Sequence, residues 1–300
     1  MYTRILVPLD GSATAEAVLP YAQAFAVGFK TSVELLSVVD IGAMTTHLSA
    51  EKVPQFNAVV DNEEKNSESY LDDVAKNFFS GLPTECRIVR GSPAETILES
   101  TSKDQDTLIA MATHGRSGAK RFLLGSVAEK VLRGSTNPLF LVRAAAAKTT
   151  PQRIINSIVV PLDGSALAEQ ILPTVSNWAQ ALGVEVTLIR AFEFPASSYY
   201  GSEEDLPDYD AFREEARKQA AAYLKQKEES LVGEGVRTVS TLTLEGPAAA
   251  EIIRYAQTSP RAVIAMSTHG RSGVRRWMLG SVTEKVVRHS DDPVLIVRGV

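Results

Sequence analysis

Short runs of apolar residues alternate along this chain with longer stretches in which apolar positions recur at the spacing of a helix. In the first half, the apolar runs predict strands at residues 4–9, 32–39, 84–90, 107–112 and 139–143. Helices are predicted at a small-residue stretch that begins near Ser12 and stops at Gly28, and at 57–80, 93–102 and 126–133, while 40–56 shows no clear period. Continuous apolar strands separated by helices are typical of a parallel sheet that is covered on both faces.

The second half carries the same alternation. Its apolar runs predict strands near 157–162, 185–192, 236–244, 262–267 and 294–298, with a long helix at about 208–231. Because crossovers between parallel strands are right-handed, each half is expected to be a doubly wound, Rossmann-like α/β domain with five strands.

The two halves repeat one another in sequence. ILVPLDGSATAEAVLP at 5–20 returns as IVVPLDGSALAEQILP at 158–173, and IAMATHGRSGAKRFLLGSVAEKV at 109–131 returns as IAMSTHGRSGVRRWMLGSVTEKV at 264–286. The halves also close alike, with NPLFLVR at 137–143 and DPVLIVR at 292–298. A period of this length indicates a duplicated domain, expected at residues 1–147 and 151–300 and joined by a linker that includes 144–147 and Pro151.

Composition narrows the class of protein. The 300 residues carry 31 lysines and arginines against 36 aspartates and glutamates, for a net charge of −5, and there is no basic stripe. Nucleic acid and anionic membranes are therefore not expected as partners. No apolar run reaches the length of a membrane span, the N-terminus lacks the pattern of a signal peptide, and the single cysteine, Cys86, has no partner for an internal disulfide. We expect a cytoplasmic protein.

Two polar, glycine-rich turns in each half follow predicted strands and lead into helices. One is PLDGS, at 8–12 and 161–165, and the other begins with THG and ends with GSV, at 113–127 and 268–282. In doubly wound sheets, ligands bind at the carboxyl ends of strands where the winding reverses, and free N–H groups at a helix start favour anions. The loop matches neither the Walker A pattern nor the dinucleotide G-x-G-x-x-G. Its basic residues either neutralise a phosphate or form a solvated rim: Arg116, Lys120, Arg121, Arg271, Arg275 and Arg276.

Over essentially its whole length, the chain resembles the universal stress protein family in its tandem two-domain form. The family carries G-x-x-G-x9-G-[ST] after its fourth strand, and the resemblance implies an adenine-nucleotide alpha hydrolase-like fold that binds ATP or a related adenine nucleotide, with Mg²⁺ arriving only with the phosphates. The phosphate-binding residues that it implies are Gly115, Gly125, Ser126 and Val127, and in the second half Gly270, Gly280, Ser281 and Val282. The nucleoside-contacting residues that it implies are Asp10 and Asp163, with the backbones of Val38 and Ala191 lining the base pocket.

One departure from the family pattern separates the two halves. The first glycine of the motif is Ala112 in the first half and Ser267 in the second. A Cβ atom at this position narrows the approach of a ligand to the backbone and penalises a positive φ. Because serine is the bulkier of the two, the pattern favours the first half over the second as the nucleotide site.

Structural roles for the same residues stay open. An Asp-Gly-Ser turn is also what a strand-to-helix junction requires, because aspartate and serine cap the turn and glycine frees the backbone. His114 and His269 have no nucleophile or carboxylate at a recognisable spacing, and we interpret them as loop-shaping residues. Cys86 is expected to be a small buried residue, and Trp178 and Trp277 are expected to serve in packing.

Three functions are compatible with these features. The first is a nucleotide-binding protein of stress response or signalling that holds ATP without efficient turnover, because the sequence shows neither a positioned base nor dense positive charge for a γ-phosphate. The second is an interaction module with vestigial pockets, and the third is a slow ATPase in which Asp10 or His114 orients water. The resemblance also implies that the last strands, 139–143 and 295–298, pair the halves as an internal pseudo-dimer, which leaves a homodimer of two chains open.

Overall fold

The apolar runs form parallel strands in both halves of the computed structural model, which describes residues 2–42, 53–114, 124–143, 154–193, 209–268 and 279–299. The chain divides into two compact units, Met1–Ile154 and Ile155–Val300, and each unit holds one copy of the repeat. The expected linker residues, 144–147 and Pro151, lie outside the described residues.

The sheet of unit 1 is wound in two directions from its middle. Its described strands are β1 Arg4–Pro8, β2 Ser32–Val39, β3 Thr84–Arg90, β4 Thr107–Ala112 and β5 Leu139–Val142. They lie in the order β3-β2-β1-β4-β5, and all neighbouring pairs are parallel. The chain therefore adds β2 and β3 on one side of β1 and then crosses back to add β4 on the other. This reversal leaves a crevice at the carboxyl ends of β1 and β4.

Unit 2 repeats this topology. Its described strands are β6 Ser157–Pro161, β7 Glu185–Phe192, β8 Val239–Glu245, β9 Ala262–Ser267 and β10 Val294–Val297. They lie in the order β8-β7-β6-β9-β10, again with parallel neighbours, so the winding reverses between β6 and β9. The predicted fold class, a doubly wound parallel sheet present twice, is confirmed.

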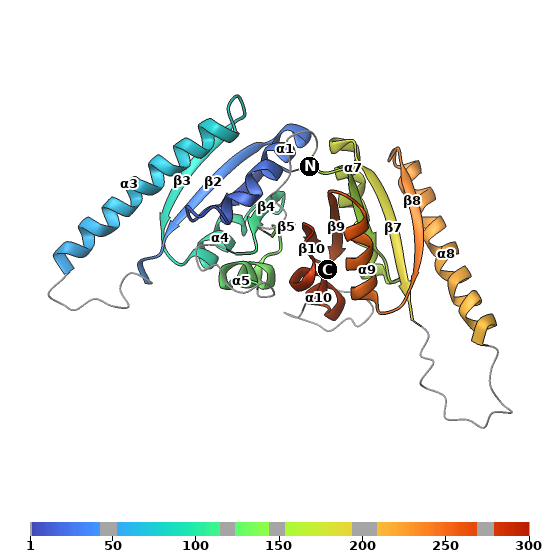
Figure 1. The fold of residues 1–300 in the computed structure, drawn as a ribbon. Coiled ribbons are helices and arrows are strands. Elements are labelled where there is room, and N and C mark those ends of the chain that lie inside the picture. The colour runs from blue at the N-terminus through green and yellow to red at the C-terminus, as the bar shows by residue number, and fades with distance from the viewer. Residues whose placement is uncertain are drawn as a thin grey trace, which may run out of the picture. The chain divides into compact units, whose positions relative to one another are not determined.

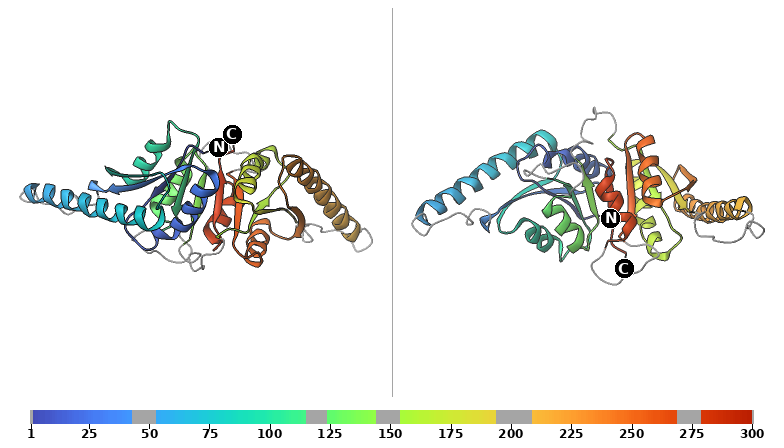
Figure 2. Two further views of the ribbon diagram at one scale, coloured as in Figure 1. Left: turned by 90° about the horizontal axis from the view of Figure 1, so that it is seen from above. Right: turned by 60° about the horizontal axis from the view of Figure 1, so that its bottom comes forward.

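Helices cover both faces of the sheet in unit 1. Within the described residues they include the 3₁₀ turn η1 Ala15–Val18 and the helices α1 Leu19–Phe29, α3 Val53–Phe78, α4 Pro93–Thr101 and α5 Ser126–Gly134. Figure 1 shows α1 and α3 on one face, with α4 and α5 on the other. The long helix α3 runs along β2 and β3, as both views of Figure 2 show, and buries Val60, Leu71 and Val74.

The helices of unit 2 are arranged in the same way. They are α6 Ala166–Glu169, α7 Leu172–Leu182, α8 Tyr209–Gly233, α9 Ala248–Thr258 and α10 Ser281–His289. The long helix α8 packs on β7 and β8, within two residues of the helix predicted at 208–231. None of the helices in the described part of the chain combines the length and apolarity of a membrane span.

Three local expectations were wrong. The first helix does not stop at Gly28 but continues to Phe29, because Phe29 is buried and Lys30 takes the left-handed cap at φ 54°. The long helix of unit 1 begins at Val53, inside a stretch that showed no clear period. Cys86 is only partly buried, because β3 is the outer strand of the sheet of unit 1 and most of its side chains are partly exposed.

Aromatic side chains fill the core next to the central strands. Phe25 on α1 meets Phe140 on β5 edge to face, with ring centroids 4.8 Å apart. Trp178 on α7 is fully buried, which confirms the packing role expected for it. Trp277 lies outside the described residues.

Candidate functional site

The Asp-Gly-Ser turn after β1 is held by its own side chains. The Asp10 Oδ1 atom accepts hydrogen bonds from the backbone N–H of Ser12 at 3.0 Å and from its hydroxyl at 2.6 Å. The Ser12 Oγ atom accepts in turn from the N–H of Ala15 at 3.1 Å, at the start of η1. Gly11 lies between them at φ 80°, a left-handed conformation that glycine adopts at little cost. These bonds fix the Asp10 carboxylate at the carboxyl end of β1.

Unit 2 has the same turn after β6. The Asp163 Oδ1 atom accepts from the N–H of Ser165 at 2.9 Å and from its hydroxyl at 2.6 Å, and Gly164 has a φ of 87°. The Ser165 Oγ atom caps α6 by accepting from the N–H of Ala168 at 3.1 Å. The capping roles expected of Asp, Gly and Ser in this turn are therefore confirmed in both units, and one oxygen of each carboxylate serves the turn.

Gly125 determines where α5 begins. Its N–H donates to the carbonyl of Thr113 at 2.8 Å, and its own carbonyl accepts the first helical bond, from the N–H of Glu129 at 2.8 Å. A Cβ atom on Gly125 would come within 2.8 Å of the Thr113 carbonyl, so another residue would require a backbone shift. The N–H groups of Ser126 and Val127 lie in the first turn, where no acceptor within the helix exists. They carry the partial positive charge of a helix start, which favours an anion.

The start of α10 in unit 2 is built alike. The N–H of Gly280 donates to the carbonyl of Thr268 at 2.7 Å, and the N–H of Glu284 donates to the carbonyl of Gly280 at 2.8 Å. Ser281 and Val282 therefore occupy the first turn, as Ser126 and Val127 do in α5. The remaining loop candidates lie outside the described residues: Gly115, Arg116, Lys120, Arg121, His269, Gly270, Arg271, Arg275 and Arg276.

A cavity of about 460 Å³ lies in unit 1 where the carboxyl ends of β1 and β4 meet the start of α5. It brings together every described candidate residue of the first half: Asp10, Val38, Ala112, Gly125, Ser126 and Val127. Apolar walls come from Leu36, Ile97 and Met111. An apolar lining with a few convergent polar groups is the usual character of a small-molecule site.

The family motif names neither Asp40 nor His114, but both residues line this cavity. Asp40 lines it and follows β2 directly, so the rule that ligands bind beyond the carboxyl ends of strands could have found it. His114 also lines the cavity, and its Nδ1 atom lies 3.0 Å from the Oγ1 atom of Thr113. A hydroxyl contact to one ring nitrogen orients the imidazole at the edge of the cavity.

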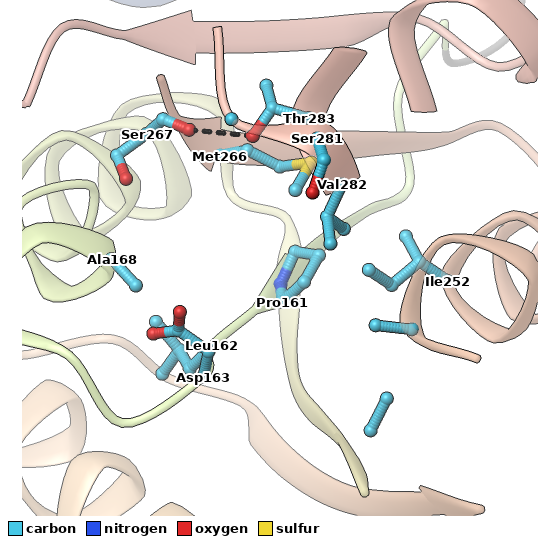
Figure 3. Close-up of a pocket in the computed structure, with 13 residues that line it drawn as sticks. Pro161, Leu162, Asp163, Ala168, Ile252, Met266, Ser267, Ser281, Val282 and Thr283 are labelled. Atoms are coloured by element: carbon cyan, nitrogen blue, oxygen red, sulfur yellow. Dashed lines mark hydrogen bonds between the residues drawn. The ribbon is translucent and has the colours of Figure 1, made fainter. Parts of the chain in front are cut away.

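The matching pocket of unit 2 has a volume of about 250 Å³. It likewise brings together every described candidate residue of the second half: Asp163, Ala191, Ser267, Gly280, Ser281 and Val282. Figure 3 shows Asp163 on one side of this pocket and Ser281 and Val282 on the other. Ile252 and Met266 contribute the apolar wall.

A charged cluster supports the turn of unit 2. A Cβ atom on Gly164 would meet the guanidinium of Arg190 at 3.2 Å, and that guanidinium lies 4.7 Å from the ring centroid of Tyr223. The Tyr223 hydroxyl donates to Glu169 at 2.9 Å, and Lys227 donates to the same carboxylate at 2.8 Å. Burial, followed by the hydrogen bond to Glu169, raises the pKa of Tyr223, so the hydroxyl stays a donor. The cluster ties α6 and the turn before it to α8.

Comparison with known proteins gives the same family for both units. The family model described as "Universal stress protein family" matches residues 1–143 and 155–298. The universal stress protein MJ0577 of Methanocaldococcus jannaschii is 32% identical over 155 residues, which cover 48% of this chain and 96% of that protein. A universal stress protein of Mycolicibacterium smegmatis is 21% identical over 302 residues, covering 98% of this chain and 96% of that one. The crystal structure of a universal stress protein from Archaeoglobus fulgidus has the same fold over 100% of both chains, with a TM-score of 0.74 and 23% identity.

Proposed function

Because the chain belongs to the universal stress protein family, we propose that it binds ATP or a related adenine nucleotide in the cavity of unit 1. The observation that carries this proposal is the convergence of the Asp10 carboxylate and the start of α5 on one cavity of about 460 Å³. A cavity of this size falls within the range that drug-sized ligands occupy. The bound nucleotide is held without efficient turnover, and the protein acts in stress response or signalling in the cytoplasm.

Each part of an adenine nucleotide has a matching group in the cavity of unit 1. Phosphate oxygens would accept hydrogen bonds from the N–H groups of Ser126 and Val127, where the helix dipole adds about 0.3–1 kcal/mol. Ribose hydroxyls would donate to the carboxylate of Asp10. The adenine ring would pack against Val38 and Ile97, which belong to the apolar part of the lining.

A magnesium ion would enter this cavity with the phosphates of the nucleotide. Mg²⁺ prefers oxygen ligands, keeps several waters and usually takes one or two carboxylates from the protein. Asp10 and Asp40 are the carboxylates among the described residues of the lining. Their charge fits a metal that the nucleotide already coordinates.

Retention of the nucleotide without hydrolysis is supported by the charges around the cavity. Phosphoryl transfer requires an oriented water and dense positive charge at the transferred group. The described residues of the lining include Asp10 and Asp40 but neither lysine nor arginine. Among these described residues, no lysine or arginine would stabilise the transfer of a γ-phosphate.

Calorimetric titration of the full chain with ATP–Mg²⁺ tests the proposed site. Asp10→Asn keeps an oxygen that can accept from Ser12 but removes the negative charge that receives the ribose hydroxyls. It should weaken ATP binding by at least about tenfold, which corresponds to about 1.4 kcal/mol. Asp163→Asn, the same change in the equivalent turn of unit 2, should leave the affinity for ATP unchanged. No heat with ATP–Mg²⁺, together with no adenine nucleotide released when fresh protein is denatured, would refute the proposal.

We also propose that the two units form an internal pseudo-dimer through β5 and β10, and that two chains associate further. Within their own units these are the outermost strands in the order, and both are apolar, with the sequences LFLV and VLIV. Apolar edge strands pair readily with other edges. A chain with both Leu141→Lys and Ile296→Lys should therefore be cleaved faster by protease between the units, and its sedimentation coefficient should fall. An unchanged cleavage rate and sedimentation coefficient would refute the pairing.

A further inference from the structure

The pocket of unit 2 is the smaller one, at about 250 Å³ against about 460 Å³ in unit 1. Each described lining residue of unit 2 has an equivalent in the cavity of unit 1, which also reaches Leu36, Asp40, Thr113 and His114. At two of the shared positions, unit 2 has the smaller side chain: Ala191 corresponds to Val38, and Ala248 corresponds to Pro93. These differences alone would make the pocket of unit 2 the larger one. Among the shared positions, space can therefore be lost in unit 2 only where its side chain is the larger of the two.

The lining positions at which unit 2 has the larger side chain lie where β9 meets α10. Ser267, the last residue of β9, corresponds to Ala112, and Thr283 in the first turn of α10 corresponds to Ala128. The Thr283 Oγ1 atom donates to the carbonyl oxygen of Ser267 at 3.1 Å, as Figure 3 shows. Both residues are buried: 5% of the surface of Ser267 and 4% of the surface of Thr283 is exposed. Ala128 has no hydroxyl, so unit 1 cannot form this bond.

This hydrogen bond ties the first turn of α10 to the end of β9. Ser281 and Val282, at the start of the same turn, line the same pocket. Separating two buried, hydrogen-bonded groups leaves each of them without its partner, so the turn resists moving away from the strand. At this end of the pocket, where phosphates would lie, unit 2 therefore has the larger side chains, and the hydrogen bond holds Thr283 in place.

We propose that Thr283 is a specificity-determining residue, which limits the pocket of unit 2 to an adenine nucleoside or its monophosphate and excludes ATP. The inference rests on the proposed function, because it assumes that ATP occupies the equivalent pocket of unit 1. A volume of about 250 Å³ lies below the range of about 300–1,000 Å³ for drug-sized ligands, whereas about 460 Å³ lies within it. Asp163, Ala191 and Ile252 still provide contacts for ribose and base.

Counting the binding sites of the full chain by calorimetry tests the role of Thr283. The natural chain should bind ATP–Mg²⁺ at one site and AMP at two. Thr283→Ala should add a second site for ATP and keep both for AMP, whereas Thr283→Ser retains the hydroxyl and should still show one site for ATP. The reciprocal change, Ala128→Thr, should weaken ATP binding to unit 1 by at least about tenfold and AMP binding by less than about threefold.

Asp163→Asn assigns the second AMP site to unit 2, because it should remove that site and leave ATP binding unchanged. Three results would each overturn the inference while nucleotide binding by unit 1 stands: two ATP sites in the natural chain, no AMP site in unit 2, or a single ATP site in Thr283→Ala. Retention of AMP by unit 2 without any ATP binding by unit 1 would refute the proposed function instead. Binding of AMP in both variants of Thr283 shows that their pockets are folded.

Discussion

Units 1 and 2 share a fold but place their charged side chains differently. In unit 1, Glu34 on β2 is 4% exposed and forms ion pairs with Arg4 on β1 and, at 2.7 Å, with Arg87 on β3. Arg4 and Arg87 also donate to Ser100 on α4, so the charged group lies between the sheet and this helix. The equivalent positions of unit 2 carry no charge: Ser157, Thr187 and Leu242.

Unit 2 has instead a charged cluster beside its Asp-Gly-Ser turn. Arg190 and Lys227 of this cluster correspond to Ser37 and Val74 in unit 1, whereas Tyr223 has a counterpart in Tyr70. The apolar strand positions and the strand order are common to both units. The apolar pattern therefore determines this fold, and polar and charged positions diverged without changing it. The two pockets also differ at polar positions, because unit 2 has Ser267 and Thr283 where unit 1 has Ala112 and Ala128.

Removal of the buried carboxylate of unit 1 should have the largest effect on stability. Loss of one member of a buried ion pair costs about 3–5 kcal/mol, but the side chains of Arg4 and Arg87 are 28% and 36% exposed and can regain water. Glu34→Ala should therefore destabilise unit 1 by roughly 2–3 kcal/mol. Native-state hydrogen exchange measures this loss in each unit separately. Thr187→Ala, the matched change in unit 2, should cost less than about 1 kcal/mol, and equal losses would contradict the comparison.

Replacement of Asp292 in unit 2 should change the stability of that unit by a smaller amount, and the change should depend on pH. It corresponds to Asn137, whose side-chain N–H group donates to the carbonyls of Asp104 at 2.5 Å and Thr107 at 3.3 Å. An ionised carboxylate cannot donate to such carbonyls. Burial, and then the charge of Asp291, raise the pKa of Asp292 above its usual value. Asp292→Asn should therefore stabilise unit 2 at neutral pH by about 0.5–1 kcal/mol, since the side chain is only partly buried.

The sign of the pH dependence follows from the raised pKa of Asp292 in the folded state. Ionisation of this side chain disfavours the fold, so unit 2 should gain stability as the pH falls from neutrality through that pKa. The Asp292→Asn protein lacks this gain, and the difference between the two proteins should shrink in acid. Thermal unfolding at neutral and acidic pH measures the difference, and Asn137→Asp should create the same dependence in unit 1. If the difference in stability between the natural and the Asp292→Asn protein stayed constant with pH, Asp292 would not be the source of the pH dependence.

The smallest predicted effect on stability concerns the C-terminal ends of α1 in unit 1 and α7 in unit 2. Lys30 ends α1 at φ 54°, and Gly183 ends α7 at φ 64°; each donates its N–H to a carbonyl of the preceding turn. A left-handed conformation costs a residue with a Cβ atom about 1–2 kcal/mol, and the greater entropy that glycine loses on folding offsets part of this. Lys30→Gly should stabilise unit 1 by about 0.5 kcal/mol in calorimetric unfolding.

Gly183→Ala provides the matched control at the end of α7. A Cβ atom on Gly183 has no neighbour within 4 Å, so any loss of stability would come from the backbone alone. The alanine variant should destabilise unit 2, and a stabilised variant would contradict the cost assigned to the left-handed caps.

Most of the fold could be predicted from the sequence because its strands are continuous apolar runs. β1, β4 and β9 were predicted to within a residue at each end. β4 and β9 are buried along their whole length, and β1 is buried at its three central residues. The end of α1 was mispredicted because a glycine inside a helix costs only about 1 kcal/mol, which the burial of Phe29 next to Gly28 offsets. The partial exposure of Cys86 depends on the place of β3 at the edge of its sheet, which local pattern does not contain.

The candidate site could be predicted only as far as the repeat and the family motif reach. Asp10 and Ser126 lie more than a hundred residues apart, and the motif marked both as candidates before the fold brought them to one cavity. Thr283 was missed because its role depends on how closely α10 approaches β9, and a threonine in a helix has no sequence signal for such a contact. The raised pKa of Asp292 was missed for the same reason, since it arises from burial in the folded chain.

Amide hydrogen exchange at the starts of α5 and α10, measured with and without ATP–Mg²⁺, shows whether unit 1 holds the nucleotide at the start of α5. We predict slower exchange at Ser126 and Val127 when ATP is present, because their N–H groups would then donate to phosphate, and no change at Ser281 and Val282. Equal protection of both helix starts would contradict the difference between the two units. Unchanged exchange at Ser126 and Val127 would contradict nucleotide binding at this site.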